Sequence, residues 1–396
     1  MTTVWLSVLG AAAAFAAYTY FGYPMLLLLL GAVRRRRRRP AVPFTEWPAI
    51  SIVLPVYNEE AVIRNRLENL LQLDYPAERR QILVVSDACT DRTDAIVAEY
   101  RSRGVELLRM PHRAGKTAAE NAARPRLRGE IIVHTDASVH VERGGLRALI
   151  ASFADPTVGV ASSHNVSVAR VDEHANYAES WYVGYDMWIR DLETRIHGIV
   201  GAAGCFYAAR GRIQAYVLPD DLSPDFAVSL IAQEQGFRTT SVRHAVCFVP
   251  RIPSLRREYR RKVRTIARGW QTLYFKRSLL NPMRSGVFSW ILVSHKICRW
   301  LVPHAGVLSL VALACLGRSV PWARFGVAVA ALAGLCAALG WWWPDGRRLP
   351  RLATVPAYLV IGNLAALHAS LRAARGARTP TWEPTRREVA RAAELA

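Results

Sequence analysis

Polar side chains follow four short apolar runs in the first part of the chain, and their types suit one kind of ligand. The first run is followed by Tyr57 and Glu59, the second by Asp87, the third by Lys116 and the fourth by Asp136. An aromatic ring can stack on a flat base, carboxylates can accept hydrogen bonds from a base and a ribose, and a cation can neutralise phosphate. A carboxylate can also hold a divalent ion that bridges phosphate oxygens. Together these residue types predict a sugar-nucleotide site.

Lys116 stands out because the chain almost never uses lysine. Of 52 Lys plus Arg residues only four are lysines, at positions 116, 262, 276 and 296. A compact ammonium fits close to a phosphate better than a planar guanidinium does, and Lys116 follows Gly115 in a predicted loop. We therefore expect Lys116 to contact the diphosphate, and a solvated lysine before a helix is the alternative.

Asp225 is the candidate for acid–base chemistry. It follows Pro224 and opens the helical part of an amphipathic stretch at 218–236, so capping of a helix N-terminus is one interpretation. A carboxylate there could instead be the general base that deprotonates an acceptor hydroxyl. The residues by themselves leave both interpretations open.

The elements that must position these residues alternate along the chain. Runs of β-branched and aliphatic residues predict strands at 50–56, 81–86, 105–108 and 130–135. Amphipathic stretches such as 60–73 and 91–103 predict helices between them. Such alternation is typical of an α/β fold with a mainly parallel sheet, in which ligands bind at the carboxyl ends of the strands.

The composition indicates a membrane protein. The chain has 396 residues, of which 52% are hydrophobic, and a net charge of +21. Residues 1–33 carry no charge and can cross a bilayer, and three further apolar stretches follow at 301–317, 325–344 and 352–371. The mixed apolar and basic stretch at 287–300 predicts a helix in the membrane interface.

The positive charge is concentrated at the membrane junctions. Residues 40–250 contain 22 Lys plus Arg and 26 Asp plus Glu, a net charge of −4. The stretch 251–277 has ten basic residues and one acid, and six arginines at 34–39 follow the first apolar run. We therefore expect an uncleaved anchor with the amino terminus outside, contacts with lipid headgroups, and no nucleic-acid partner.

These patterns divide the chain into six parts. We expect an anchor at 1–33, a polybasic linker at 34–48, a cytoplasmic catalytic domain at 49–250, basic amphipathic interface helices at 251–300, a region of about three membrane segments at 301–371, and a polar tail at 372–396. Three full C-terminal crossings would leave the tail outside, although its six arginines and three glutamates favour the cytoplasmic side. Either one apolar stretch is re-entrant, or 287–317 crosses twice.

Six motifs occur in order between residues 55 and 230. They are P-V-Y-N-E-E at 55–60, S-D-A-C-T-D-R-T at 86–93, G-K-T-A-A-E-N at 115–121, T-D-A-S at 135–138, G-A-A-G-C-F-Y-A-A-R at 201–210 and P-D-F-A-V-S-L at 224–230. They resemble the family 2 glycosyltransferases, and more closely the membrane-embedded branch of cellulose, hyaluronan, poly-N-acetylglucosamine and bacterial exopolysaccharide synthases. The resemblance implies an α/β fold of the GT-A nucleotide-diphospho-sugar transferase type, a mainly parallel sheet flanked by helices, with an N-terminal transmembrane helix and C-terminal transmembrane helices.

The resemblance also implies roles for the matched residues. Tyr57, Glu59 and Asp87 would hold the uridine of a UDP-sugar, and Lys116 its diphosphate. Asp225 matches the catalytic aspartate of the family, the base for inverting transfer, although an acid that the family places before it is Pro224 here.

The metal motif of the family is altered in this chain. Asp136 matches the first acid of D-x-D, and Ser138 replaces the second. Asp136 and Ser138 are therefore the expected metal positions, and the expected ion is Mg²⁺ or Mn²⁺.

The acceptor motif Q-x-x-R-W is altered as well. It reads R-T-I-A-R-G-W at 264–270, where the glutamine is missing and a glycine separates Arg268 from Trp270. We expect Gly204, Cys205, Arg268 and Trp270 to contact the acceptor, and the altered motif puts processive polymerisation in doubt.

The resemblance thus implies an inverting hexosyltransferase in the bacterial cytoplasmic (inner) membrane. It would move a sugar from a UDP-sugar to a glycan or lipid-linked acceptor at the cytoplasmic face, in exopolysaccharide or cell-envelope glycan synthesis. Transfer of one sugar to a polyprenyl phosphate or glycolipid is the alternative, and a catalytically silent membrane scaffold is a remote one. An export or accessory subunit could be a further partner.

Overall fold

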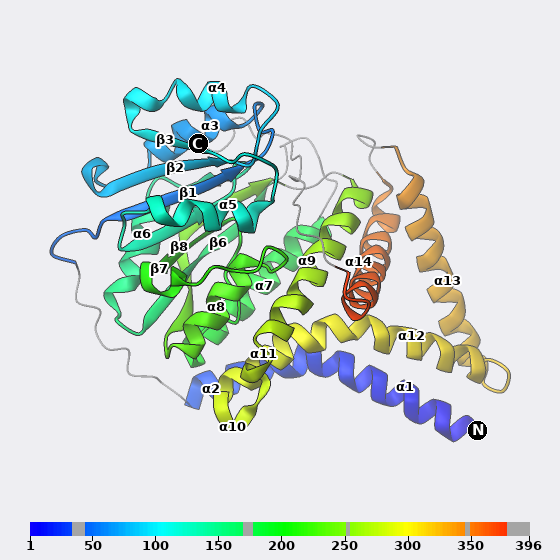
Figure 1. Cartoon of the computed structure of the whole chain (residues 1–396). Helices are drawn as coiled ribbons and strands as arrows, with labels where there is room; N and C mark the ends of the chain where they lie inside the picture. Colours follow the sequence, from blue (N-terminus) through cyan, green and yellow to red (C-terminus); the bar gives the residue numbers. More distant parts are fainter. Residues whose placement is uncertain (34–43, 169–176, 251–253, 345–348, 378–396) are drawn as a thin grey trace.

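The computed structural model describes residues 1–33, 44–168, 177–250, 254–344 and 349–377. Within these ranges an α/β domain is joined to a group of long helices (Figure 1). The arginine run at 34–39 and the tail beyond residue 377 lie outside the described residues, so the expectations for them stay predictions.

An eight-stranded sheet forms the centre of the α/β domain. Its strands are β1 (Ile50–Val56), β2 (Arg80–Ser86), β3 (Val105–Arg109), β4 (Ile131–Thr135), β5 (His140–Val141), β6 (Val158–Val168), β7 (Phe206–Arg210) and β8 (Arg238–Pro250). The order is β3-β2-β1-β4-β7-β6-β8-β5. The pairs β3-β2, β2-β1, β1-β4 and β6-β8 are parallel, and β7 and β5 run antiparallel to their neighbours. The sheet is therefore mixed and mostly parallel.

The central strands are buried and mostly apolar because helices cover both faces of the sheet. The covering helices are α3 (Ile63–Leu71), α4 (Thr93–Ala98), α5 (Lys116–Ala123), α6 (Gly145–Ala151), α7 (Tyr177–Ile196) and α8 (Pro224–Glu234). Every residue of β1 is buried. Ile52 belongs to the cluster that includes Leu67 of α3, and its neighbour Val53 to the cluster that includes Ala119 of α5. Successive side chains of one strand therefore fill two different cores.

The strand register brings the predicted donor residues to one edge of the sheet. Val56, the last residue of β1, pairs with Ser86, and Ser86 pairs with Arg109. Because these three parallel strands end level with one another, the loops after them are neighbours. In β4, His134 pairs with Val53, so Asp136 lies close to the same edge.

The other helices of the described ranges, most of them apolar, lie outside the α/β domain. They are α1 (Thr2–Ala17), α2 (Tyr23–Val33), α9 (Leu255–Phe275), α10 (Pro282–Ser285), α11 (Val287–Leu292), α12 (Arg299–Leu316), α13 (Pro321–Trp342) and α14 (Arg351–Ala374). Four helical runs in the described ranges are long and apolar enough to cross a membrane: Thr2–Val33, Val287–Leu316, Pro321–Trp342 and Leu352–Ala374. The stretch 287–300, for which we expected a separate interface helix, is continuous with α12 through a π-helical segment (Val293–Cys298).

Polar contacts join the apolar helices to the α/β domain at α7. The Tyr23 hydroxyl of α2 donates to the Glu193 carboxylate at 2.5 Å, and Arg299 of α12 donates to Asp186 at 2.7 Å. Leu27 of α2 packs in the same cluster as Ile189 of α7. The first apolar run and the C-terminal helices thus attach to the same helix of the α/β domain.

Candidate functional site

A cavity of about 300 Å³ opens where the strand ends meet α8 and α9. Its polar and charged lining residues are Lys116, Asp136, Asn165, Ser167, Ser223, Asp225, Arg261, Arg264, Thr265 and Arg268. The cavity therefore brings together the predicted phosphate contact, the predicted metal position and the predicted base from segments that are far apart in the sequence.

Lys116 lies between two carboxylates at the start of α5. Its ammonium donates to Asp136 at 2.6 Å and to the Gly204 carbonyl at 3.0 Å, and it lies 3.9 Å from Glu120. Burial by itself would lower the pKa of Lys116, but the negative charges of Asp136 and Glu120 outweigh it, so the pKa is raised above its ordinary value. The lysine is charged at neutral pH and poised to meet an anion that enters the cavity.

Asp87 builds the loop that presents Lys116. Its buried carboxylate accepts hydrogen bonds from the backbone N–H groups of Ala114 at 2.7 Å and Gly115 at 2.9 Å. Gly115 has a φ of 97°, which glycine adopts without strain. Asp87 therefore fixes the backbone immediately before Lys116, and a contact of Asp87 with a base stays a prediction.

Tyr57 and Glu59 lie in the loop after β1, outside the lining of the 300 Å³ cavity. The Arg113 guanidinium covers one face of the Tyr57 ring, 3.9 Å from its centroid. The backbone N–H of Glu59 donates to the Thr93 hydroxyl at 2.8 Å, which ties this loop to the start of α4. Sequence reasoning missed Arg113, because nothing in the sequence distinguishes it from the other arginines of the chain.

Asp225 occupies the first turn of α8 but does not cap it. The N-cap position is Ser223, and the Ser223 hydroxyl donates to the Asp225 carboxylate at 2.7 Å. A Cβ atom at Gly204 would lie 3.0 Å from the other oxygen of Asp225, so glycine leaves the approach to this carboxylate open. The capping interpretation is therefore wrong for Asp225, and its carboxylate belongs to the cavity.

Arg268 braces α9 against the site. It is 6% exposed, and its guanidinium donates to the Thr117 hydroxyl at 2.6 Å and to the Asp220 carbonyl at 2.9 Å. Burial lowers the pKa of Arg268, and the charge of Asp225 opposes that shift. Sequence reasoning missed Arg261 and Arg264, whose spacing with Arg268 at i, i+3 and i+7 places all three on one helix face.

The structure separates the remaining acceptor and metal candidates. Gly204 and Cys205 line the cavity, and the Cys205 carbonyl accepts the backbone N–H of Asp136 at 3.0 Å. Trp270 faces away from the cavity, and its indole N–H donates to the Ser370 hydroxyl of α14 at 3.2 Å. Ser138 is half-buried and is not among the described residues that line the cavity.

The lining of the cavity suits a metal ion that shares its ligands with a bound diphosphate. No cluster of three or more His, Cys, Asp or Glu able to hold a metal occurs within the described ranges. Asp136 supplies one carboxylate, which is sufficient for a divalent ion whose other ligands are phosphate oxygens and water. The residues thus fit an ion that arrives with a diphosphate.

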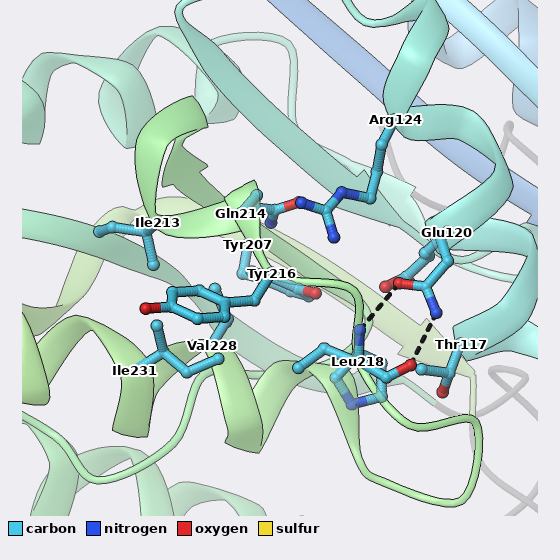
Figure 2. A pocket seen from close by; sticks show the side chains of 12 residues that line it. Thr117, Glu120, Arg124, Tyr207, Ile213, Gln214, Tyr216, Leu218, Val228 and Ile231 are labelled. Atoms are coloured by element: carbon cyan, nitrogen blue, oxygen red, sulfur yellow. Dashed lines mark hydrogen bonds between the residues drawn. The ribbon is translucent and has the colours of Figure 1, made fainter.

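A second, small pocket of about 20 Å³ is lined by Thr117 and Glu120 of α5 and by Leu218 of the segment before α8 (Figure 2). Asn121 of α5 accepts the backbone N–H of Leu218 at 3.1 Å and donates to the Leu218 carbonyl at 2.7 Å. Other polar residues that line the small pocket are Glu120, Tyr207 and Gln214. The two hydrogen bonds between Asn121 and Leu218 tie the segment before α8 to α5. The motif at 115–121 therefore positions both Lys116 and the helix that carries Asp225.

Comparisons with known proteins show which families the chain is similar to. Residues 51–210 match the family model described as glycosyl transferase family 2. A beta-monoglucosyldiacylglycerol synthase of Synechocystis sp. is 34% identical over 117 residues, which are 28% of this chain and 24% of that protein. The beta-monoglucosyldiacylglycerol synthase of Nostoc sp. is 29% identical over 156 residues, 38% of this chain and 33% of that protein. The chain thus spans about a quarter to a third of the length of these relatives.

A solved structure shares the fold over nearly the whole chain. It is a mannosyltransferase from Pyrobaculum calidifontis in complex with GDP-Man and Mn²⁺, and the superposition covers 94% of this chain and 100% of that one with a TM-score of 0.71. The sequence identity is 22%, so this likeness shows the fold.

Proposed function

We propose that the protein transfers a sugar from a nucleoside-diphosphate sugar to a membrane-associated acceptor with inversion at the anomeric carbon. The match of residues 51–210 to the family 2 glycosyl transferase model and the shared fold support this proposal. The observation that carries this proposal is that Asp225 lines the same cavity as the Lys116–Asp136 pair. A base and a phosphate-binding cation are therefore available to one substrate complex.

Each residue has one task in the proposed reaction. An acceptor hydroxyl attacks the anomeric carbon, the bond from that carbon to the diphosphate breaks, and Asp225 takes the hydroxyl proton. Lys116 neutralises the negative charge that develops on the leaving nucleoside diphosphate. A divalent ion held by Asp136 and the diphosphate would supply further positive charge at the same oxygens.

The donor that we favour is a UDP-sugar, because the motifs at 55–60 and 86–93 resemble those of enzymes that use UDP-sugars. The structural relative from Pyrobaculum calidifontis was solved with GDP-Man, so a donor screen has to include both bases. Arg113 over Tyr57 marks the position at which the base would stack, and the base would replace or extend that contact.

The acceptor we favour is a lipid-linked one that receives a single sugar. Two relatives are named for the synthesis of a monoglucosyl lipid. Arg261, Arg264 and Arg268 line the cavity from α9, which also packs on the apolar helix α14. Trp270 of the altered acceptor motif contacts α14 and does not line the cavity. Because the motif that holds a growing polymer in the resembling synthases is altered here, we favour transfer of a single sugar. We place the reaction at the cytoplasmic face of the inner membrane.

The proposal is tested with Asp225→Asn in purified protein. We expect transfer to fall about a hundredfold to ten-thousandfold, as is typical when a general base is removed, with folding and donor binding retained. Asp220→Asn is the control, because Asp220 is exposed five residues earlier and its side chain does not line the cavity. Transfer to an extracted lipid acceptor and nucleotide release are measured with UDP- and GDP-sugars. Wild-type transfer by folded Asp225→Asn would contradict the assignment.

A further inference from the structure

The wall that α9 gives to the cavity is cationic. Its three arginines there are Arg261, Arg264 and Arg268. With Lys116 they make four cations among the described lining residues, against the two carboxylates of Asp136 and Asp225. A donor bound with a divalent ion engages Lys116 and Asp136 at its diphosphate. The guanidiniums of α9 are then the charged groups that surround the other substrate.

Arg268 marks the donor end of this wall. Its guanidinium donates to the Thr117 hydroxyl at 2.6 Å, and Thr117 follows Lys116 directly in the chain. Arg264 and Arg261 lie four and seven residues earlier on the same helix face, which is about 6 and 10 Å along the helix axis. They are therefore placed progressively farther from the diphosphate position at Lys116.

The other end of α9 meets the end of the apolar helix α13, and Figure 1 shows α9 between the α/β domain and the helices α13 and α14. The Tyr259 ring packs edge-on against Trp341 of α13, with the ring centroids 5.3 Å apart, and Trp342 is 71% exposed. Tryptophan at the end of an apolar helix is typical of the membrane interface, where lipid headgroups lie. Arg261 and Arg264 thus lie between the level of the donor diphosphate and the level of the lipid headgroups.

Arg261 is oriented by a buried acid of its own helix. Its guanidinium donates to the Glu258 carboxylate at 2.8 and 2.7 Å, and Glu258 is 2% exposed. The Lys262 amine lies 3.8 Å from the same carboxylate. Because one acid is shared by two cations, this turn of α9 keeps a net positive charge. A guanidinium held in one orientation is well suited to phosphate oxygens.

The proposed base limits which group of the acceptor is attacked. Asp225 is required by an acceptor with a hydroxyl group, since a phosphate oxygen is already ionised at neutral pH. A phosphate bound by Arg261 and Arg264 is therefore not the attacked group. It lies one or two turns of α9 away, a span that the sugar or polyol part of a headgroup fills.

We propose that the acceptor is a lipid whose hydroxyl-bearing headgroup is joined to its hydrocarbon chain through a phosphate, and that Arg261 and Arg264 bind this phosphate. This inference rests on the proposed function, because it names the chemical class of the acceptor at the same cavity. A sugar linked to polyprenyl diphosphate and a phosphatidyl polyol both have this chemistry, whereas a neutral glycerolipid lacks the phosphate.

The product of the purified wild-type protein tests the class of the acceptor. Labelled sugar is transferred to a total bacterial lipid extract, and the product is treated with aqueous hydrofluoric acid, which cleaves phosphate esters and leaves glycosidic bonds in place. We expect the label to pass from the organic to the aqueous phase. Release by hot dilute acid as well identifies the polyprenyl diphosphate source, and release by hydrofluoric acid alone identifies the phosphatidyl polyol. Label that stays in the organic phase after both treatments would overturn the proposal while the proposed function stands.

Binding tests the arginines without any sugar transfer. The probes are farnesyl phosphate and farnesol, which differ only in the phosphate, and their affinities for the full chain in a non-ionic detergent are measured by calorimetry. We expect Arg264→Gln to weaken farnesyl phosphate binding about tenfold or more and to leave the binding of farnesol and of UDP unchanged.

Arg260→Gln is the matched control for Arg264→Gln. Arg260 is exposed on α9 and is not among the described residues that line the cavity. Equal affinities of the two variants for farnesyl phosphate would overturn the proposal. A loss of UDP binding in Arg264→Gln as large as the loss of farnesyl phosphate binding would overturn it too, because the arginine would then serve the donor. Since binding requires no transfer, its outcome is separate from that of the proposed function.

Discussion

At the scale of single residues, the site depends on Lys116 and the carboxylates around it. Asp136 and Glu120 keep its ammonium charged, and Asp87 holds the backbone from which it extends. The raised pKa means that Lys116 carries its charge below that pKa, so its contribution to donor binding is not expected to change between pH 7 and 9. A lysine in a chain of arginines therefore has a defined role, because the narrow space between Asp136 and the Gly204 carbonyl suits a compact cation.

Lys116→Met is expected to raise the donor KM about tenfold to a hundredfold, which is what loss of a charge-assisted hydrogen bond costs. Nucleotide release measured against donor concentration checks this. Lys276→Met is the control, because the Lys276 amine pairs with Glu234 away from the cavity. An unchanged donor KM in Lys116→Met would show that the diphosphate lies elsewhere.

At the scale of elements, α9 joins the catalytic domain to the apolar helices, and Gly269 permits that contact. A Cβ atom at residue 269 would lie 2.8 Å from the Trp300 ring of α12. The glycine that interrupts the expected motif thus lets α9 approach α12 closely, while Arg268 beside it faces the cavity and Trp270 faces α14. The Trp270 ring also packs on the Trp300 ring, with their centroids 4.9 Å apart, so this turn of α9 joins the cavity to both α12 and α14.

Gly269→Ala is expected to lower the thermal unfolding temperature of the detergent-solubilised protein, because overpacking of a close contact costs about 1–3 kcal/mol. The matched control is Gly144→Ala, since a Cβ atom there would meet nothing within 4 Å. We also expect a raised acceptor KM in Gly269→Ala, because the shift moves Arg268. Equal unfolding temperatures for the two variants would contradict this role of Gly269.

At the scale of the whole molecule, buried charges fasten the α/β domain to its apolar helices. Asp186 of α7 accepts from Arg299 at 2.7 Å and lies 2.9 Å from Arg190 and 3.2 Å from His295. Burial by itself would raise the pKa of Asp186, but Arg190 and the His295 contact outweigh it, so the pKa is well below its ordinary value. The carboxylate therefore stabilises the folded state above the unfolded pKa of about 4, and this contribution is lost only as the pH falls through the lower folded pKa.

Asp186→Asn is accordingly expected to lower the unfolding temperature by the same amount at pH 5.5, 7 and 8. Glu99→Gln is the control, because the Arg64–Glu99 pair is half-exposed at the surface and such pairs contribute little. A difference between wild type and Asp186→Asn that changed between pH 5.5 and 8 would show that another group, such as His295, governs this junction.

The strands, the polar residues after them and the four apolar runs followed from the sequence alone, because each is a local pattern. Short runs of β-branched and aliphatic residues, apolar runs of bilayer length and charge at their ends are set by neighbouring residues. The strand register then carried Lys116 and Asp136 to one edge as predicted. The prediction of a mostly parallel sheet was confirmed as well, because it followed from the alternation of strands and helices along the chain.

The tertiary structure decided which side chains share the cavity and which helices pack against one another. Arg261 and Arg264 line the cavity, Trp270 turns away from it, and Asp225 is free of the helix cap because Ser223 takes that position. The sequence pattern of α14 is that of a span, and only the tertiary structure shows that it packs on the basic helix α9. A local pattern records whether a segment is apolar, but which neighbour it meets depends on contacts between residues far apart in the chain, and those contacts form only when the whole molecule packs.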